Sequence, residues 1–403
     1  MFFADFHIHS KYSRAVSINT NLQTLSDSAK MKGLKVLGTG DFTHPLWFED
    51  LKNNLKPLEN GLFEFNGVFF MLTVEVSTIS YKGDKAKKVH QVVHVPSLEI
   101  AEQLNDVYSK LANLKSDGRP TFKISPSEFL EKTFAVSDEV VVIPAHIFTP
   151  WFSVFGSKSG FDSVEECYED QTKRIFALET GLSADPGMCW RMSILDKFSF
   201  VSNSDSHSVG KIGRECNALD CEISFREIFK AIKEKDKKKF LFTVEFFPEE
   251  GKYHFDGHRN CNFSCSPQEA LKLNNKCPVC GKPLVLGVEH RVEALADRPE
   301  GFVPKDAIPF KHLIPLVEVV AQSLEKKVTT VGVKREFKRI ADELGSELDI
   351  LMNVDLDKIR SVGGERFAEG IERMRSEKVF KKAGFDGVFG EVSVFPKQKQ
   401  LVE

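Results

Sequence analysis

The sequence lacks the features of membrane and secreted proteins. No stretch approaches the roughly 20 consecutive apolar residues that a membrane-spanning helix needs. The start, MFFADFHIHS, leads directly into a strand-like run and does not have the layout of a signal peptide. No internal repeat or low-complexity tract stands out either. We therefore expect a globular protein of the cytoplasm, with no membrane partner.

An excess of basic charge is also missing. The chain has 55 Lys and Arg against 58 Asp and Glu, so its formal net charge is −3. This balance argues against a uniformly basic, nucleic-acid-coating surface. Any contact with nucleic acid must come from local patches, such as the lysines between Lys82 and Lys88.

Cysteine is too rare for a disulfide framework. A chain of 403 residues has eight cysteines, and a cytoplasmic protein rarely forms disulfides. Four of them are bunched between residues 261 and 280. The other four are scattered and are expected to be buried thiols: Cys167, Cys189, Cys216 and Cys221.

Up to about residue 240, short apolar runs alternate with helical patterns, which is typical of a βα-repeating domain. Start and stop signals accompany the helices: Asn21 precedes a run that stops at Gly33, and Ser224 with Glu227 precedes Phe229. We predict parallel strands wrapped by helices. The strand-like runs are 2–6, 35–37, 69–76, 89–95, 140–144, 175–178 and 198–201.

Composition changes twice along the chain, which predicts three domains. A charged stretch, 233–239, ends the βα pattern, and the following 253–292 segment is rich in Cys, His, Gly and Pro with little periodicity. From Pro309, apolar residues recur at helical spacing. With 41% hydrophobic residues, the chain can bury at least one large core. We predict an α/β domain over residues 1–238, a small module held together by a metal ion over 239–300 and a helical C-terminal domain over 301–403.

Seven of the eleven histidines lie before residue 210, most of them at the ends of apolar runs, where barrel enzymes place their sites. His7 and His9 share one face of an extended segment, so one ion could bind both. That pair alone is weak evidence, because two partly exposed histidines at a strand end would look the same. Other ligand-type residues follow later strands, and together they predict a metal site: Asp41, His44, Glu75, His146, Asp205 and His207.

A cluster of His, Asp and Glu predicts two or three divalent ions, Zn, Mn or Mg, with Glu75 able to bridge two of them. Sites of this kind hydrolyse their substrates: one ion acidifies a water, and the others neutralise phosphate oxygens and the leaving alkoxide. No side-chain nucleophile is then needed. Consistently, the chain has no G-x-S-x-G elbow, no Walker loop and no convincing Cys/His nucleophile pair. Glu75, Asp205 and Asp41 are the predicted catalytic carboxylates.

The order DFHIH, GTGD, the strand end at Glu75, the His90 strand, IPAH and SNSDSH resembles the polymerase-and-histidinol-phosphatase (PHP) superfamily over residues 1–235. The resemblance implies a distorted, seven-stranded (β/α)7 barrel with three metal ions. His94 shares a strand face with His90 and is expected to be packed. The implied ligands are His7, His9, Glu75, His90, His146, Asp205 and His207.

The sequence departs from the superfamily pattern in two places. Phe42 follows Asp41 where the superfamily usually has histidine, and the histidine often found shortly after His9 is missing. Asp41 and His44 are the predicted substitutes at the third metal position.

The bunched cysteines form two close pairs, Cys261-x3-Cys265 and Cys277-x2-Cys280, which predict a zinc-ribbon-like site. Four thiolates satisfy a tetrahedral zinc, and such closed sites are structural. The alternative is four unliganded thiols, which would leave the segment little to hold it together. We predict one structural zinc on these four cysteines, with the neighbouring His254, His258 and His290 as surface or supporting residues.

The order of a PHP-like barrel, KYHFDGHRNC with CPVCGKPLVLGVEHRVEALADRPEG, and a helical domain containing FDGVFGEVSVF resembles the endonuclease Q family over nearly the full chain. The resemblance implies a DNA repair endonuclease that hydrolyses the phosphodiester on the 5′ side of a damaged nucleotide. The implied lesions are deaminated bases, namely hypoxanthine, uracil and xanthine, and abasic sites. Damaged DNA, double- or single-stranded, would be the partner; the sequence identifies no replication or repair protein that acts with it.

Two groups of residues beside the predicted site could contact DNA. Trp151 and Phe152 follow His146, so they should lie at the barrel mouth, where aromatic rings could wedge into a base stack or line a pocket for an extruded base. Packing against the zinc module or the C-terminal domain is the alternative. Near His90, Lys85, Lys87 and Lys88 are placed to meet phosphates, although a solvated charged loop is the default interpretation.

Two other functions stay open at this point. A PHP-type phosphatase acting on a small phosphomonoester, such as histidinol phosphate, would use the same metal site, but the zinc module and the helical domain argue against it. A binding protein with a remnant barrel is the other alternative. It is disfavoured because nearly every ligand position is retained.

Overall fold

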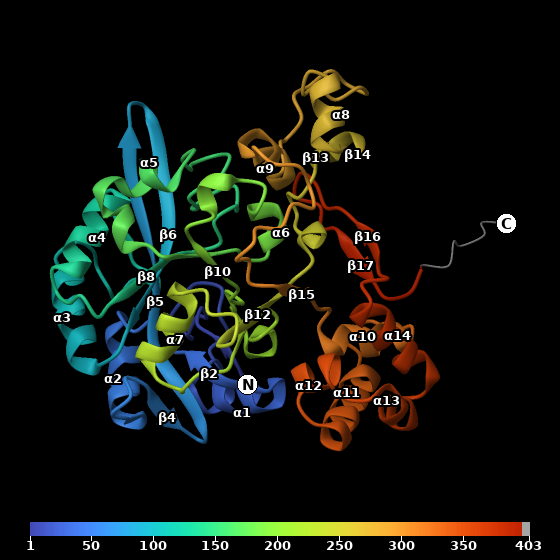
Figure 1. The fold of residues 1–403 in the computed structure, drawn as a ribbon, viewed down its shortest axis with the longest axis horizontal. Helices are drawn as coiled ribbons and strands as arrows, with labels where there is room; N and C mark the ends of the chain where they lie inside the picture. Colours follow the sequence, from blue (N-terminus) through green and yellow to red (C-terminus); the bar gives the residue numbers. More distant parts are fainter. Residues whose placement is uncertain (397–403) are drawn as a thin grey trace.

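A mixed sheet organises the first part of the chain (Figure 1). In the computed structural model, which describes residues 1–396, an eleven-stranded sheet has the order β15-β12-β11-β1-β2-β5-β4-β3, with β6 and β7 paired to β5 and β8 paired to β6. Strands β9 and β10 form a separate parallel pair. The strands are β1 (Phe2–Asp5), β2 (Leu34–Gly38), β3 (Lys56–Pro57), β4 (Phe63–Phe65), β5 (Val68–Lys82), β6 (Lys85–Val95), β7 (Thr121–Phe122), β8 (Val141–Pro144), β9 (Ala177–Glu179), β10 (Ser199–Val201), β11 (Cys216–Leu219), β12 (Phe240–Glu245) and β15 (Phe310–His312).

The central strands enclose a common apolar interior, which confirms the predicted α/β barrel class. Among the described residues, eight strands each contribute a buried side chain to one cluster, and Phe229 and Ile232 of helix α7 pack against it. The eight are Ala4, Val36, Met71, Ile143, Ala177, Val201, Leu219 and Phe240. Helices surround this domain: α1 (Leu22–Lys32), α2 (Pro45–Asn54), α3 (Leu98–Ser109), α4 (Pro126–Phe134), α5 (Val164–Tyr168), α6 (Pro186–Cys189) and α7 (Phe225–Lys233).

The predicted helix signals act as expected. The Asn21 side chain accepts a hydrogen bond from the Thr24 amide and the Thr24 hydroxyl bonds back, so α1 begins with a capping box. Gly33 ends α1 with φ of 89°, a left-handed conformation that glycine adopts at little cost. Ser224 likewise accepts from the Glu227 amide at the start of α7. These local signals fix where the covering helices begin and end.

The sheet is not all parallel, which corrects the expectation of purely parallel strands. β1 is parallel to β2 but antiparallel to β11, and β5 and β6 form a long antiparallel hairpin. Only Gly83 and Asp84 connect β5 to β6, and Gly83 supplies the positive φ, 60°, that so tight a turn requires. The hairpin tip projects beyond the barrel at the upper left of Figure 1.

A small module follows the barrel. It contains the hairpin β13 (Asp256–His258) and β14 (Phe263–Cys265), helix α8 (Pro267–Lys272) and helix α9 (Val288–Leu295). Its apolar core is minimal and includes Cys265, Ala270, Cys277 and Leu284. The boundaries predicted at 238 and 300 stay predictions; β12 and β15, which lie beyond them, extend the central sheet.

The predicted helical C-terminal region is confirmed. It comprises α10 (Leu316–Ser323), α11 (Val331–Leu344), α12 (Glu347–Met352), α13 (Leu356–Gly363) and α14 (Glu365–Arg375), followed by the hairpin β16 (Phe380–Lys382) and β17 (Glu391–Ser393). A buried ion pair, Lys32 Nζ to Glu347 Oε2 at 2.8 Å, fastens these helices to α1. No helix in residues 1–396 is both long and apolar enough to cross a lipid bilayer.

Candidate metal centres

Histidines and carboxylates from five strands meet at one end of the barrel. His7 and His9 follow β1, Glu75 lies in β5 and His90 in β6. His146 follows β8, and Asp205 follows β10. The strand-end rule used on the sequence accounts for the residues that follow β1, β8 and β10. The strand end predicted at Glu75 is wrong, because β5 continues to Lys82 and Glu75 lies inside it.

The residues form two groups that share Glu75. Candidate ligand atoms of His7, His9, Glu75 and Asp205 all lie within 4.8 Å of one another, and so do those of Glu75, His90 and His146. The two oxygens of Glu75 face different groups. Oε1 lies 2.6 Å from His90 Nδ1 and 2.9 Å from His146 Nε2, whereas Oε2 lies 3.3 Å from His9 Nε2. Glu75 therefore faces both groups, and its role as a bridge between two ions stays a prediction.

The donor set fits divalent ions. His7 Nδ1 lies 2.9 Å from Glu179 Oε1, which fixes the ring, while His7 Nε2 is buried and has no hydrogen-bond partner. A ring held through one nitrogen by a carboxylate, with the other nitrogen aimed at further carboxylates, is the usual arrangement of a metal-binding histidine. Imidazole and carboxylate together suit Zn, Mn or Mg.

The electrostatics of the cluster keep its carboxylates ionised, and these carboxylates in turn raise the pKa of His7, His9 and His146 despite their burial. Burial alone would raise the pKa of Glu75, but the charges of His90 and His7 outweigh it and hold that pKa well below its usual range. Burial alone would also raise the pKa of Asp205, but the hydrogen bond with His9 and the charge of His7 lower it. Burial lowers the pKa of His90 to about 4.

Three non-glycine residues of this region have left-handed backbones: His146 (φ 29°), Asp205 (φ 44°) and Asp41 (φ 49°). Such conformations cost about 1–3 kcal/mol each and persist where surrounding structure enforces them, often at functional sites. Gly181 provides the space for the turn at His146, because a Cβ at Gly181 would lie 2.5 Å from His146 Cβ. These strained backbone conformations therefore occur at two candidate metal ligands, His146 and Asp205, and at Asp41, which contacts the ligand His9.

Two supporting residues were missed from the sequence. Glu179, at the end of β9, binds His7 and accepts hydrogen bonds from the His146 amide (3.0 Å) and Asn203 Nδ2 (2.9 Å). Arg119 Nη1 lies 3.0 Å from Glu75 Oε2. The strand-end rule could have found Glu179, whereas no motif marks Arg119, which lies in the loop before β7.

Glu179→Gln should lower activity by about 10- to 100-fold, the usual effect of losing a residue that orients a metal ligand. Glutamine keeps the shape but removes the charge that stabilises His7. The measurement is cleavage rate against metal concentration, with thermal melting as the folding control. The loss should shrink as the metal concentration rises. A loss that is independent of metal concentration would contradict the assigned role.

Asp41, His44 and His207 are not members of the two groups described above. Asp41 Oδ2 accepts hydrogen bonds from the Ser10 amide and hydroxyl, both at 2.7 Å, and its Oδ1 lies 3.1 Å from His9 Nδ1. Both carboxylate oxygens are thus engaged, and Asp41 is arranged to orient His9. The third metal position at Asp41 and His44 stays a prediction.

His44 and His207 make ring contacts. His44 stacks on Tyr12 with 4.2 Å between ring centroids, and the His207 ring lies 4.4 Å from the His9 ring. His94 is packed as predicted: it contacts Phe229, and burial lowers its pKa to about 3. Of the two histidines on β6, only His90 joins a candidate ligand group in the described part of the chain.

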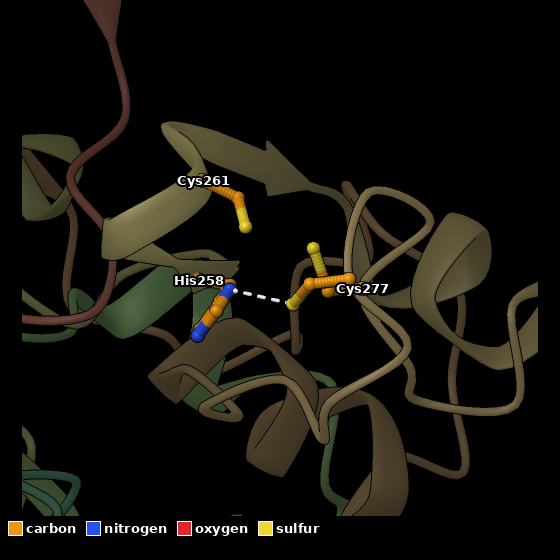
Figure 2. A group of neighbouring side chains, drawn as sticks. His258, Cys261 and Cys277 are labelled. Carbon is orange, nitrogen blue, oxygen red and sulfur yellow. Dashed lines mark hydrogen bonds between the residues drawn. The ribbon is translucent and has the colours of Figure 1, made fainter.

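The second candidate centre lies in the small module and differs from the predicted cysteine quartet. Ligand atoms of His258, Cys261, Cys277 and Cys280 lie within 4.8 Å of one another (Figure 2). His258 Nδ1 is 3.4 Å from Cys280 Sγ. Three cysteines and one histidine are a common set for a closed tetrahedral zinc.

Cys265 is the residue that the prediction misplaced. It pairs with Asp256 across the β13–β14 hairpin, two positions from the pair formed by His258 and Phe263, and its side chain is buried in the module core. Cys265 and His258 thus lie on the same face of the hairpin, two pair positions apart, and it is His258 that lies beside the other three thiols. In the turn between Cys277 and Cys280, desolvation would raise the pKa of the Cys277 thiol, but the backbone N–H groups of Cys280 and Val279 lower that pKa to about 7.

The scattered cysteines are thiols without disulfides. Cys167, Cys189 and Cys216 are buried as predicted, and Cys221 is half-buried. Burial raises the pKa of all four, so none is suited to act as a nucleophilic thiolate.

The predicted DNA-contacting residues lie in two different settings. Phe152 contacts His90, with 4.6 Å between the ring centroids, and Trp151 beside it is 44% exposed. Of the three lysines, Lys85 is exposed at the hairpin tip. Lys87 lies over the Phe161 ring at 4.6 Å and Lys88 over Phe152 at 5.1 Å, so both have partners within the chain.

Solved structures match nearly the whole chain. A crystal structure of the lesion-specific endonuclease PfuEndoQ from Pyrococcus furiosus is 34% identical, with a TM-score of 0.87 over 98% of this chain and 96% of that one. A crystal structure of Endonuclease Q in complex with a 27-mer duplex substrate, with an abasic lesion at the active site, is also 34% identical. Its TM-score is 0.86 over 98% of this chain and 97% of that one.

The sequence matches are consistent with this similarity. Residues 315–378 match the family described as the MJ0043 C-terminal domain. The uncharacterized protein MJ0043 of Methanocaldococcus jannaschii is 34% identical over 261 residues, which are 62% of this chain and 32% of that protein. The chain thus spans about a third of the length of this relative.

Proposed function

The chain belongs to the endonuclease Q family, and we propose that it is a metal-dependent DNA endonuclease that cuts at damaged nucleotides. The observation that carries this proposal is the shared Glu75 between two buried candidate ligand groups at the end of the barrel. A related structure, 34% identical over nearly its whole length, holds a duplex with an abasic lesion at its active site. The ligand groups are the proposed catalytic site, and the related complex supports damaged DNA as the substrate.

We propose that His7, His9, Glu75 and Asp205 hold one ion and that Glu75, His90 and His146 hold a second. When bound, divalent ions supply an acidified water and neutralise charge on the phosphate oxygens. Arg119 adds a fixed positive charge beside Glu75, and Asp41 and Glu179 keep the His9 and His7 rings oriented. Buried ligands keep bulk water out, which strengthens each of these charge interactions.

The finer assignment follows the family resemblance. We propose hydrolysis of the phosphodiester 5′ to deaminated bases, namely hypoxanthine, uracil and xanthine, and to abasic sites. Selectivity requires that the damaged nucleotide leave the base stack, which is easiest for a mispaired or missing base. Trp151 and Phe152, next to the metal centre, are the proposed contacts to the displaced nucleotide, and Lys85 is the proposed phosphate contact.

A panel of substrates tests the proposal. Labelled duplexes with hypoxanthine, uracil or an abasic site, a matched undamaged duplex and p-nitrophenyl phosphate are each incubated with the protein, with and without added Mn²⁺, Zn²⁺ or Mg²⁺. We expect cleavage of the lesion duplexes only, loss of cleavage on chelation, and recovery to different degrees with each ion. Hydrolysis of the small phosphomonoester without cleavage of any duplex would support a phosphatase instead.

A further inference from the structure

The loop that closes the β16–β17 hairpin carries an exposed aromatic ring. Phe389 is 70% exposed and the neighbouring Val388 is 36% exposed. The Lys252 ammonium lies 4.3 Å from the centroid of the Phe389 ring, a cation–π distance that holds the ring in place. An aromatic ring held by a basic side chain at the surface is a common feature of nucleic-acid contacts.

The loop is fastened rigidly to the segment that precedes the zinc module. Gly384 N donates to Glu249 O at 2.8 Å, and Gly390 N donates to Glu250 O at 3.1 Å. The approach is so close that a Cβ at Gly390 would lie 1.9 Å from Glu249 O. The loop is therefore a preorganised element, and its sequence, FDGVFG, has glycines where the backbones touch.

The same loop continues the aromatic surface of the barrel mouth. Trp151 packs edge-on against Tyr253, with ring centroids 5.5 Å apart. Tyr253 in turn adjoins the loop, because its hydroxyl lies 3.6 Å from where a Cβ of Gly387 would stand. Trp151 and Tyr253 thus connect the barrel mouth to the loop that carries Phe389. We call Trp151, Tyr253 and Phe389 the aromatic ridge; it begins beside Phe152, whose ring contacts that of His90.

Positive charge accompanies this ridge. Lys252 and Arg259 are both exposed, and the Arg259 guanidinium lies 3.3 Å from the Cβ position of Gly387. Asp386 adds the opposite charge, but its carboxylate accepts a hydrogen bond from the Arg259 amide at 2.6 Å. Aromatic rings interleaved with cations match the alternating bases and phosphates of a DNA strand.

We propose that this ridge holds the DNA beside the metal centre and that Phe389 enters the base stack of the duplex next to the displaced nucleotide. The inference rests on the proposed function and adds a DNA-contacting element from the C-terminal region. A ring that fills the vacated space replaces stacking that the duplex loses when a nucleotide is extruded. Phe389 is more exposed than Trp151, which Tyr253 partly covers.

The test compares Phe389→Ala with Phe389→Trp and with a matched control, Phe380→Ala. Phe380 is 45% exposed and lies on β16 of the same hairpin, away from the loop. Each full-length variant is assayed on a duplex with one abasic site and on the same strand alone. With metal chelated, 2-aminopurine opposite the lesion reports unstacking by its fluorescence.

Phe389→Ala should lower the rate of duplex cleavage by about 10- to 100-fold, which corresponds to the loss of one base–aromatic stacking interaction. The same variant should lose most of the fluorescence change. Cleavage of the single strand should be nearly unchanged, and Phe389→Trp and Phe380→Ala should resemble the parent. Duplex cleavage by Phe389→Ala equal to that of Phe380→Ala would overturn the inference, and so would an equal loss on the single strand. If the parent cuts neither substrate, the proposed function fails, and the fluorescence experiment still decides whether Phe389 enters the stack.

Discussion

Glu75→Gln is expected to abolish cleavage of damaged DNA while leaving DNA affinity nearly unchanged. The substitution keeps the shape of the side chain but removes the charge that faces both ligand groups. Residues that only orient metal ligands contribute about 10- to 100-fold, so loss of the shared ligand should exceed 100-fold. Single-turnover cleavage measures the first quantity, and fluorescence anisotropy of a labelled duplex measures the second.

Two variants complete the Glu75 experiment. Asp205→Asn removes a carboxylate from the first group alone and should also inactivate the protein. Glu102→Gln is the matched control. Glu102 is an exposed residue of helix α3, away from the metal centre, and its carboxylate lies 3.1 Å from Lys52 Nζ of helix α2. Retained turnover in a folded Glu75→Gln protein would refute the assignment of this carboxylate.

His258→Ala and Cys277→Ser are expected to lose one bound zinc and to destabilise the small module, whereas Cys265→Ala should keep the zinc. The geometry groups His258, and not Cys265, with the other three cysteines. Zinc binding at structural sites is worth about 10–16 kcal/mol, so a module with so small a core should depend on it. Metal content by mass spectrometry and thermal melting are the measurements.

The outcome of that comparison separates two ligand sets. Zinc loss in Cys265→Ala with zinc retained in His258→Ala would restore the four-cysteine site predicted from spacing. DNA affinity should fall more than the chemical step when zinc is lost, because the module adjoins the aromatic ridge and not the Glu75 carboxylate.

Apolar periodicity was sufficient to predict most of the barrel. The runs at 2–6, 35–37 and 140–144 became β1, β2 and β8 within one or two residues. Strand direction was not predictable in the same way, because a run of buried apolar residues looks alike in parallel and antiparallel sheets. The two-residue connection at Gly83 and Asp84 was the available signal for the β5–β6 hairpin.

Four of the six candidate ligands were predictable because they follow strands whose ends meet. Glu75, which joins the two groups, was predicted at a strand end but lies inside β5. The zinc set was predicted less well, since spacing between cysteines does not reveal how far along a hairpin each one lies from the others. Cys265 shares a hairpin face with His258 but lies two pair positions away, and that offset is set by the pairing of β13 with β14.

Contacts between segments that are distant in the sequence could not be predicted from it. Lys32 and Glu347 form a buried ion pair across more than three hundred residues, and nothing in either local sequence marks the other as a partner. The same holds for the loop at Gly384 and Gly390, which closes on residues 249–251. The first contact joins the C-terminal helices to α1, and the second joins the β16–β17 loop to the segment before the small module.

The most direct test of the central claim is the position of the cut. A duplex with one hypoxanthine, labelled at the 5′ end of the lesion strand, is incubated with the protein and a divalent ion, and the product is sized to single-nucleotide resolution. We predict one product that ends immediately 5′ to the lesion and is absent after chelation and with Glu75→Gln. Equal cleavage of a matched undamaged duplex, or no cleavage of the lesion strand with any of the three ions, would contradict the account.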